Sequence, residues 1–181
     1  ALYVNHHGEL MDIQATLSTI AEVAITLAGF NGLVIALAGD GRDTRQAFFR
    51  VSAIVAACFV LVIAALLPTG LVAATVSEKM SFGIASIFLG VGFIAVGICM
   101  AIAGSKGIFV SSTPIFSLVL RIPSFGLAFF LVLAPIFDWV SSMSALLLLS
   151  CFWFISLVGA YFILSVLWVL QNKAKAVEYE S

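Results

Sequence analysis

Long uncharged stretches alternate with short charged ones along the chain, and this alternation is its strongest pattern. A helix needs about 20 mostly apolar residues to cross the hydrocarbon core of a bilayer, and most of these stretches reach that length. The pattern predicts one all-α domain, a polytopic transmembrane helical bundle with five spans. The expected spans are residues 13–39, 47–76, 80–104, 122–139 and 142–170.

The fourth stretch is short and contains Pro123 and Pro135, a residue type that disfavours helix interiors. A four-span alternative, with residues 108–138 as a re-entrant or interfacial segment, therefore stays open. Lys and Arg accumulate in cytoplasmic loops and help to separate the two arrangements. Five spans with the N-terminus outside place every basic residue except Lys79 on the cytoplasmic side, whereas four spans send the two C-terminal lysines outward. The charge pattern favours five spans, N-out and C-in.

Composition supports the membrane assignment and limits the partners. Hydrophobic residues make up 63% of the chain and charged residues 9%, and the mean hydropathy is +1.23, far from the range of soluble domains. A formal net charge of -1 gives no long-range field that would gather nucleic acid. Partners are therefore expected in the bilayer, as membrane lipids, further copies of the chain or subunits of a larger complex.

Four arginines at the edges of the apolar stretches are expected to lie at the lipid headgroups. Long basic side chains hold their charge at the headgroup level while their stems lie along apolar surface. They also set the orientation of the chain. These residues are Arg42, Arg45, Arg50 and Arg121.

Small residues recur at intervals of three or four positions in the first and third stretches. In a bilayer, helices associate through close packing of small residues, so these faces are expected at helix–helix contacts. Either the faces pack against one another within one chain, or one of them, foremost that of the third stretch, meets another copy or a larger partner. The residues are Ala28 and Gly32 in the first stretch, and Gly83, Ser86, Gly90, Gly97 and Ala101 in the third.

Glu22 is an acid inside an otherwise apolar run, and two interpretations account for it. In the first, Thr19-Ile20-Ala21-Glu22 is a capping box at the start of the membrane-embedded helix, near the outer headgroups. In the second, the helix is continuous from Glu9, and Ser18, Glu22, Thr26 and Gly29 form one polar stripe that lines a water path. An intramembrane carboxylate is a functional candidate because hydrocarbon disfavours its charge.

Catalytic and metal-binding patterns are not apparent in the sequence. No histidine occurs in an apolar stretch, which leaves no obvious base for a nucleophile and no axial ligand for a haem within the bilayer. His6 and His7 are the only candidate metal ligands, but adjacent histidines point to different faces of a helix and match no fixed zinc spacing. We therefore expect no enzyme activity, no cofactor and no metal.

The strings TLAGFNGLVIAL at residues 26–37 and GRDTRQAFFR at residues 41–50 are followed by AALLP at residues 64–68. This order resembles small uncharacterised multi-span proteins of bacterial inner membranes, whose first helix carries a TLAGF-x-G string. The likeness covers about the first 70 residues. It implies bacterial origin, location in the inner (cytoplasmic) membrane and topology, and no functional residue.

Two functions follow as hypotheses. The first is a non-enzymatic membrane protein that acts by helix–helix association, as a homo-oligomer or as an accessory subunit of a larger membrane complex. The alternative is an ion channel or a proton-coupled transporter of small solutes, with Ser18, Glu22 and Thr26 along the path and a kink at Pro68 as the hinge.

Overall fold

The described chain consists of five helices and contains no strand. A computed structural model describes the backbone of residues 2–38, 42–105 and 114–180, and side-chain environments at 11–34, 48–49, 51–103, 122–167 and 170. Each helix holds one of the apolar stretches, so the all-helical prediction is confirmed. The helices are α1 (Leu2–Ala38), α2 (Arg42–Ala73), α3 (Glu78–Ser105), α4 (Pro114–Phe137) and α5 (Met143–Glu180).

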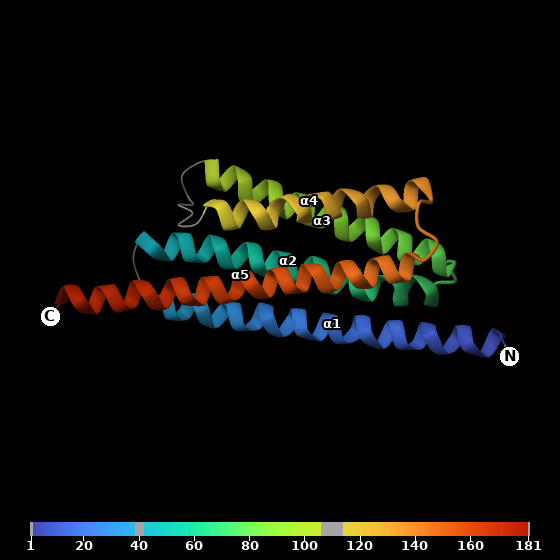
Figure 1. Cartoon of the computed structure of the whole chain (residues 1–181). Coiled ribbons are helices and arrows are strands. Elements are labelled where there is room, and N and C mark those ends of the chain that lie inside the picture. The colour runs from blue at the N-terminus through green and yellow to red at the C-terminus, as the bar shows by residue number, and fades with distance from the viewer. Residues whose placement is uncertain (1, 39–41, 106–113, 181) are drawn as a thin grey trace.

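Consecutive helices run in opposite directions along the bundle, so the start of α1 and the end of α5 lie at opposite ends (Figure 1). The helices form three tiers. In the middle tier α2 and α5 pack against each other, α3 and α4 cover one side of this pair, and α1 alone covers the other. Among the described residues, α1 contacts only α2 and α5, so its opposite side lies outside the bundle.

Four helices are long and apolar enough to span a membrane, with apolar windows at Met11–Val34, Val51–Ala73, Glu78–Ala103 and Met143–Leu167. The apolar part of α4 is shorter, Ile122–Phe137. The helix itself begins earlier, at Pro114, rather than near residue 122 as the uncharged run indicates. A proline fits the first position of a helix because no intrahelical partner awaits its missing N–H. Pro123 is therefore inside α4 and not in its first turn.

Two helices at the same end of the bundle terminate on a residue with positive φ that is not glycine. After α2, Thr75 has φ 66°, and the N–H of Val76 bonds to the carbonyl of Leu71 at 3.0 Å. After α4, Asp138 has φ 54°, and the N–H of Trp139 bonds to the carbonyl of Ala134 at 3.1 Å. Both are Schellman ends, in which a left-handed residue lets the chain turn back and satisfies the last carbonyls.

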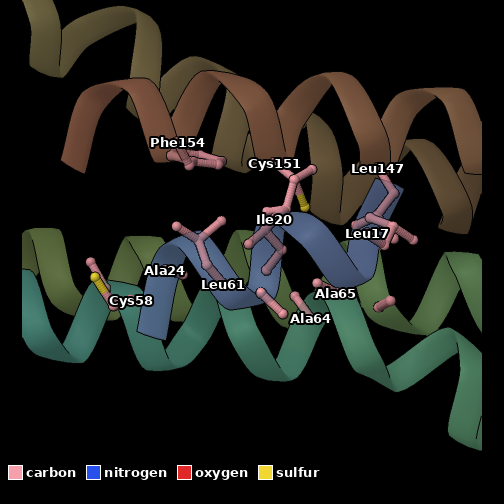
Figure 2. Packing of buried hydrophobic residues seen from close by; sticks show 14 of the residues in the cluster. Leu17, Ile20, Ala24, Cys58, Leu61, Ala64, Ala65, Leu147, Cys151 and Phe154 are labelled. Carbon is pink, nitrogen blue, oxygen red and sulfur yellow. The ribbon is translucent and has the colours of Figure 1, made fainter. Parts of the chain in front are cut away.

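The main core lies where α1, α2, α3 and α5 meet. Leu17 and Ala24 of α1 are fully buried with Leu61 of α2, and Figure 2 shows the labelled side chains of α5 pointing toward those of α1 and α2. The rings of Phe154 in α5 and Phe93 in α3 stack with centroids 3.7 Å apart, which joins α5 to α3. Many other large apolar side chains on all five helices are exposed, as a hydrocarbon-facing surface requires.

Helix α3 approaches α4 closely along its line of small residues. A Cβ added to Gly90 would lie 2.5 Å from the carbonyl oxygen of Ala128, and one added to Gly97 would overlap the ring of Phe125. Gly83 and Ser86 are buried, and a Cβ on Gly83 would sit 3.5 Å from Pro135. Ala101 is exposed. The three glycines of the small-residue face of α3 thus lie against α4 within the chain, whereas Ala101 lies outside this contact.

Basic residues lie at both ends of the bundle. At one end lie the first turns of α2, with Arg42 and Arg45, and the last turns of α5, with Lys173 and Lys175. At the other end, Lys79 forms an ion pair with Asp138, with Nζ and Oδ1 2.7 Å apart. The one basic residue that departs from the sequence-based orientation is therefore paired with an acid.

Candidate functional site: the outward face of α1

Helix α1 is continuous through the residues that the capping interpretation places at a helix start. The hydroxyl of Thr19 donates to the carbonyl of Ala15, one turn earlier, at 3.1 Å. A capping Thr would instead accept a hydrogen bond from a backbone N–H two or three residues later. The capping-box interpretation of Glu22 is therefore wrong, and the residue lies in the interior of a long helix.

The polar residues of α1 lie on the side opposite its buried face. Leu17, Ala24 and Asn31 mark the buried face. Helical periodicity of 100° per residue places the side chain of Glu22 close to the opposite direction. Four residues on this side, which we call the α1 stripe, are exposed: Ser18, Glu22, Thr26 and Gly29.

Glu22 lies near the middle of the apolar window that the structure describes in α1. Among the residues with described side chains this window is Met11–Val34, 24 residues, and Glu22 is near its centre. Its neighbours Ala21 and Ala24 belong to the same core cluster as Leu61, which is near the centre of the α2 window. Two independent helices therefore place the carboxylate away from both ends of the apolar layer.

The α1 helix gives the Glu22 carboxylate no hydrogen-bond donor. The Thr26 hydroxyl donates to the backbone carbonyl of Glu22, at 2.9 Å, and not to its side chain. The Thr16 hydroxyl donates in the same way to the carbonyl of Asp12, at 2.8 Å. Within the described chain the only ion pair joins Lys79 to Asp138, at the end of the bundle. The carboxylate thus has no partner among the described residues.

The small residues of α1 divide between its two sides. Ala28 is partly buried and packs at the edge of the main core. Gly29 and Gly32 are exposed, and a Cβ added to either would meet no atom within 4 Å. Gly32 therefore makes no close helix contact within this chain, although its spacing in the sequence placed it on a packing face with Ala28. Of these two open glycines, Gly29 belongs to the α1 stripe and Gly32 lies beside it.

Asn31 is fully buried on the inward side, away from the α1 stripe. Its side-chain nitrogen donates to the carbonyl of Leu27 at 2.7 Å, within α1 itself. Its side-chain oxygen has no hydrogen-bond partner among the described residues. Within the described part of the chain Asn31 therefore makes no bond to a neighbouring helix, and it is not joined to Glu22.

One hydrogen bond between helices could not be predicted from the sequence. The indole N–H of Trp153 in α5 donates to the hydroxyl of Ser124 in α4 at 3.2 Å. The two residues are 29 positions apart, and each lies in an apolar run where a serine or a tryptophan has no distinguishing pattern. Other buried serines bond within their own helix, as Ser86 does to the carbonyl of Phe82 at 2.9 Å. The Trp153–Ser124 bond therefore fixes α4 against α5.

The remaining predicted site residues have side chains outside the described part of the structure. The candidate metal ligands lie in the first turns of α1, and the headgroup arginines lie in α2 and α4. These residues are His6, His7, Arg42, Arg45, Arg50 and Arg121. Their expected roles stay predictions.

A scan against protein-family models finds no match for this chain, and searches of the curated proteins and of the solved structures find none either. The functional interpretation therefore depends on the chemistry of the α1 face.

Proposed function

We propose that this chain is a non-enzymatic integral membrane protein that acts by helix–helix association, as a homo-oligomer or as an accessory subunit of a larger membrane complex. The proposal places five spans, N-out and C-in, in the inner membrane of a bacterium. The basic residues at one end of the bundle and the resemblance of the first 70 residues support this placement.

The observation that carries the proposal is the exposed position of Glu22 near the middle of a membrane-spanning helix. An acidic side chain at the centre of a transmembrane helix costs about 3 kcal/mol in insertion, and acyl chains offer it no hydrogen bond. Polar residues in such positions almost always face protein or a water-filled cavity. Because the α1 stripe points away from its own bundle, a neighbouring helix from another chain is the group that would cover it.

The arrangement of the tiers supports the same conclusion. Helix α1 alone covers the pair formed by α2 and α5, whereas two helices cover the other side of that pair. Gly29 in the α1 stripe and Gly32 beside it leave room for another helix to approach closely. The face therefore combines polar groups that need a partner with space for one.

The mass of the particle extracted with its native lipids tests the proposal. Extraction with an amphipathic copolymer, followed by mass photometry or native mass spectrometry, is expected to give particles heavier than one 19.2 kDa chain. Gly29→Leu, which adds bulk on the α1 stripe, is expected to reduce the particle to a single chain. Gly126→Leu is the matched control, because Gly126 is also exposed with no atom within 4 Å of an added Cβ. A single-chain mass for the unaltered protein would contradict the proposal.

A channel or proton-coupled transporter is the second candidate, and the position of Ser18, Glu22 and Thr26 defines its form. These residues lie outside the bundle, so a path along them needs several copies with α1 facing a common axis. The hinge at Pro68 has less support, because α2 continues past this buried proline to Ala73. Ion or proton flux in vesicles containing the protein, abolished by Glu22→Gln, would support transport. Flux equal to that of empty vesicles would remove it.

A further inference from the structure

Within the four apolar windows of the described chain, Glu22 is the one charged side chain that lies away from a window end. Asp12 is the second residue of the α1 window, and Glu78 and Lys79 are the first two of the α3 window. Charges at window ends reach the headgroups and water, so they need no protein partner. Glu22 lies too far inside to do so and must find its partner at its own depth.

Among the described side chains, a second copy of this chain offers no cation at that depth. The one basic residue whose side chain is described, Lys79, lies at a window end, where it pairs with Asp138. A symmetric contact between two α1 helices would bring each Glu22 toward the other, since equivalent residues meet across a two-fold axis. Like charges at close range in a low dielectric repel. The negative charge of Glu22 therefore favours a helix of a different protein, rather than a second copy of this chain, as the partner of the α1 stripe.

The shape of the α1 stripe suits a long basic side chain. Gly29 lies on the same side as Glu22, two turns further along, and no atom of this chain would be within 4 Å of a Cβ there. Exposed apolar side chains lie next to Glu22 along α1, among them Val23 and Ile25. The methylene stem of a Lys or Arg can lie along such a surface while its charged end reaches the carboxylate. The free hydroxyl of Ser18, one turn before Glu22, adds a second hydrogen-bonding group.

Building on the proposed function, we propose that the α1 stripe binds a transmembrane helix of a different protein, which carries a Lys or Arg side chain at the depth of Glu22. This assigns the accessory-subunit form of the function to the chain. The pair of opposite charges removes the cost of leaving either one alone in hydrocarbon, and it gives the contact its specificity.

Binding of synthetic transmembrane peptides to the full-length chain in phosphatidylcholine vesicles tests the proposal. The peptides are Leu/Ala helices of about 20 residues with Lys, Leu or Glu at the centre and an acceptor dye at one end. The donor dye is attached to Cys99, because its side chain is exposed whereas Cys58 and Cys151 are buried. Energy transfer as a function of peptide-to-lipid ratio gives the affinity of each peptide.

The central-Lys peptide is expected to bind about tenfold more tightly than the central-Leu peptide. Glu22→Gln is expected to remove this difference, and Glu22→Lys is expected to transfer the preference to the central-Glu peptide. Asp12→Asn is the matched control, since it removes the same charge from an exposed position at the window end of the same helix. It is expected to leave the preference for Lys unchanged.

Equal binding of the Lys and Leu peptides to the unaltered chain would overturn the proposal, as would a preference that survives Glu22→Gln. Self-association of the chain that depends on Glu22 would also overturn it, because the occupant would then be a second copy. In that case helix association, and with it the proposed function, would stand. A single-chain particle from native lipid, together with no peptide binding, would remove both.

Discussion

The side-chain nitrogen of Lys79 lies 2.7 Å from a carboxylate oxygen of Asp138, and this contact joins the start of α3 to the end of α4. Lys79 lies in the first turn of α3, and Asp138 directly follows the last residue of α4. Their meeting shows that α4 returns along α3 to the end of the bundle from which α3 began. The contact thus supports an up-and-down arrangement in which α4 runs back beside α3.

The Lys79–Asp138 pair is expected to add little stability. Both side chains are about two-thirds exposed, at 62% and 66%, and exposed ion pairs contribute at most about 1 kcal/mol. Lys79→Gln should therefore lower the free energy of unfolding by less than this, and added salt should reduce the difference. Unfolding in mixed micelles with increasing dodecyl sulfate measures the change.

The backbone of Asp138 provides a separate prediction. Its φ of 54° is better tolerated by Asp and Asn than by Ala. Asp138→Asn removes the charge, but Asn still tolerates a positive φ. Asp138→Ala removes the charge and places a residue that tolerates this φ poorly, so it should lower the free energy of unfolding by about 1 kcal/mol more than Asp138→Asn does. Equal effects of the two substitutions in the same unfolding assay would contradict the Schellman end assigned to α4.

The approach of α3 to α4 depends on Gly90. Gly90→Ala places a methyl group 2.5 Å from the carbonyl oxygen of Ala128, and a backbone atom cannot move aside as a flexible side chain can. The substitution is expected to destabilise the protein by about 1–3 kcal/mol. Gly126→Ala in α4, where an added Cβ meets nothing within 4 Å, is expected to be neutral or slightly stabilising. Similar stabilities for the two variants would disprove the close approach.

The hydrogen bond from Trp153 to Ser124 should be measurable as a coupling between α4 and α5. In a double-mutant cycle, Ser124→Ala and Trp153→Phe are expected to show an interaction energy of about 0.6 kcal/mol, the usual size between transmembrane helices. Ser156 on α5 is a control, because it is exposed and its hydroxyl bonds to the carbonyl of Phe152 in its own helix. Ser156→Ala should show no coupling to Trp153.

Asn31 is expected to lower the free energy of unfolding relative to an apolar residue at the same position. Its side-chain oxygen is buried with no partner in the described structure, and an unsatisfied buried polar group costs about 1–3 kcal/mol. Asn31→Leu, of similar volume and without that group, should therefore raise the free energy of unfolding by about 1 kcal/mol. Asn31→Asp should lower it. A loss of stability in Asn31→Leu would mean that the oxygen has a partner, such as an ordered water.

The sequence predicts the helices of this chain well because the apolar runs are long and charged residues stand between them. It misplaces the start of α4 because Arg121 ends an uncharged run without ending the helix. The expected span 122–139 put Pro123 in the first turn of a helix, whereas α4 accommodates this proline in its interior.

The environment of Glu22 could not be decided from its sequence neighbours. Thr19-x-x-Glu22 has the same letters whether a helix begins there or passes through, and the bond from Thr19 to Ala15 settles this in favour of a continuous helix. Spacing could place Ser18, Glu22 and Thr26 on one side of α1. Only the positions of α2 and α5 show that this side faces outward.

The first helix packs against the last, and this has a consequence for biosynthesis. Leu17 and Ile20 emerge early from the ribosome, but the α5 side chains that share their core, Leu147 and Cys151, are made more than a hundred residues later. Until α5 is made, α1 packs only against α2. The side that α5 later covers and the outward side can therefore both bind other membrane proteins during this time. A partner that binds the outward side of α1 can therefore join the chain before the chain has finished folding.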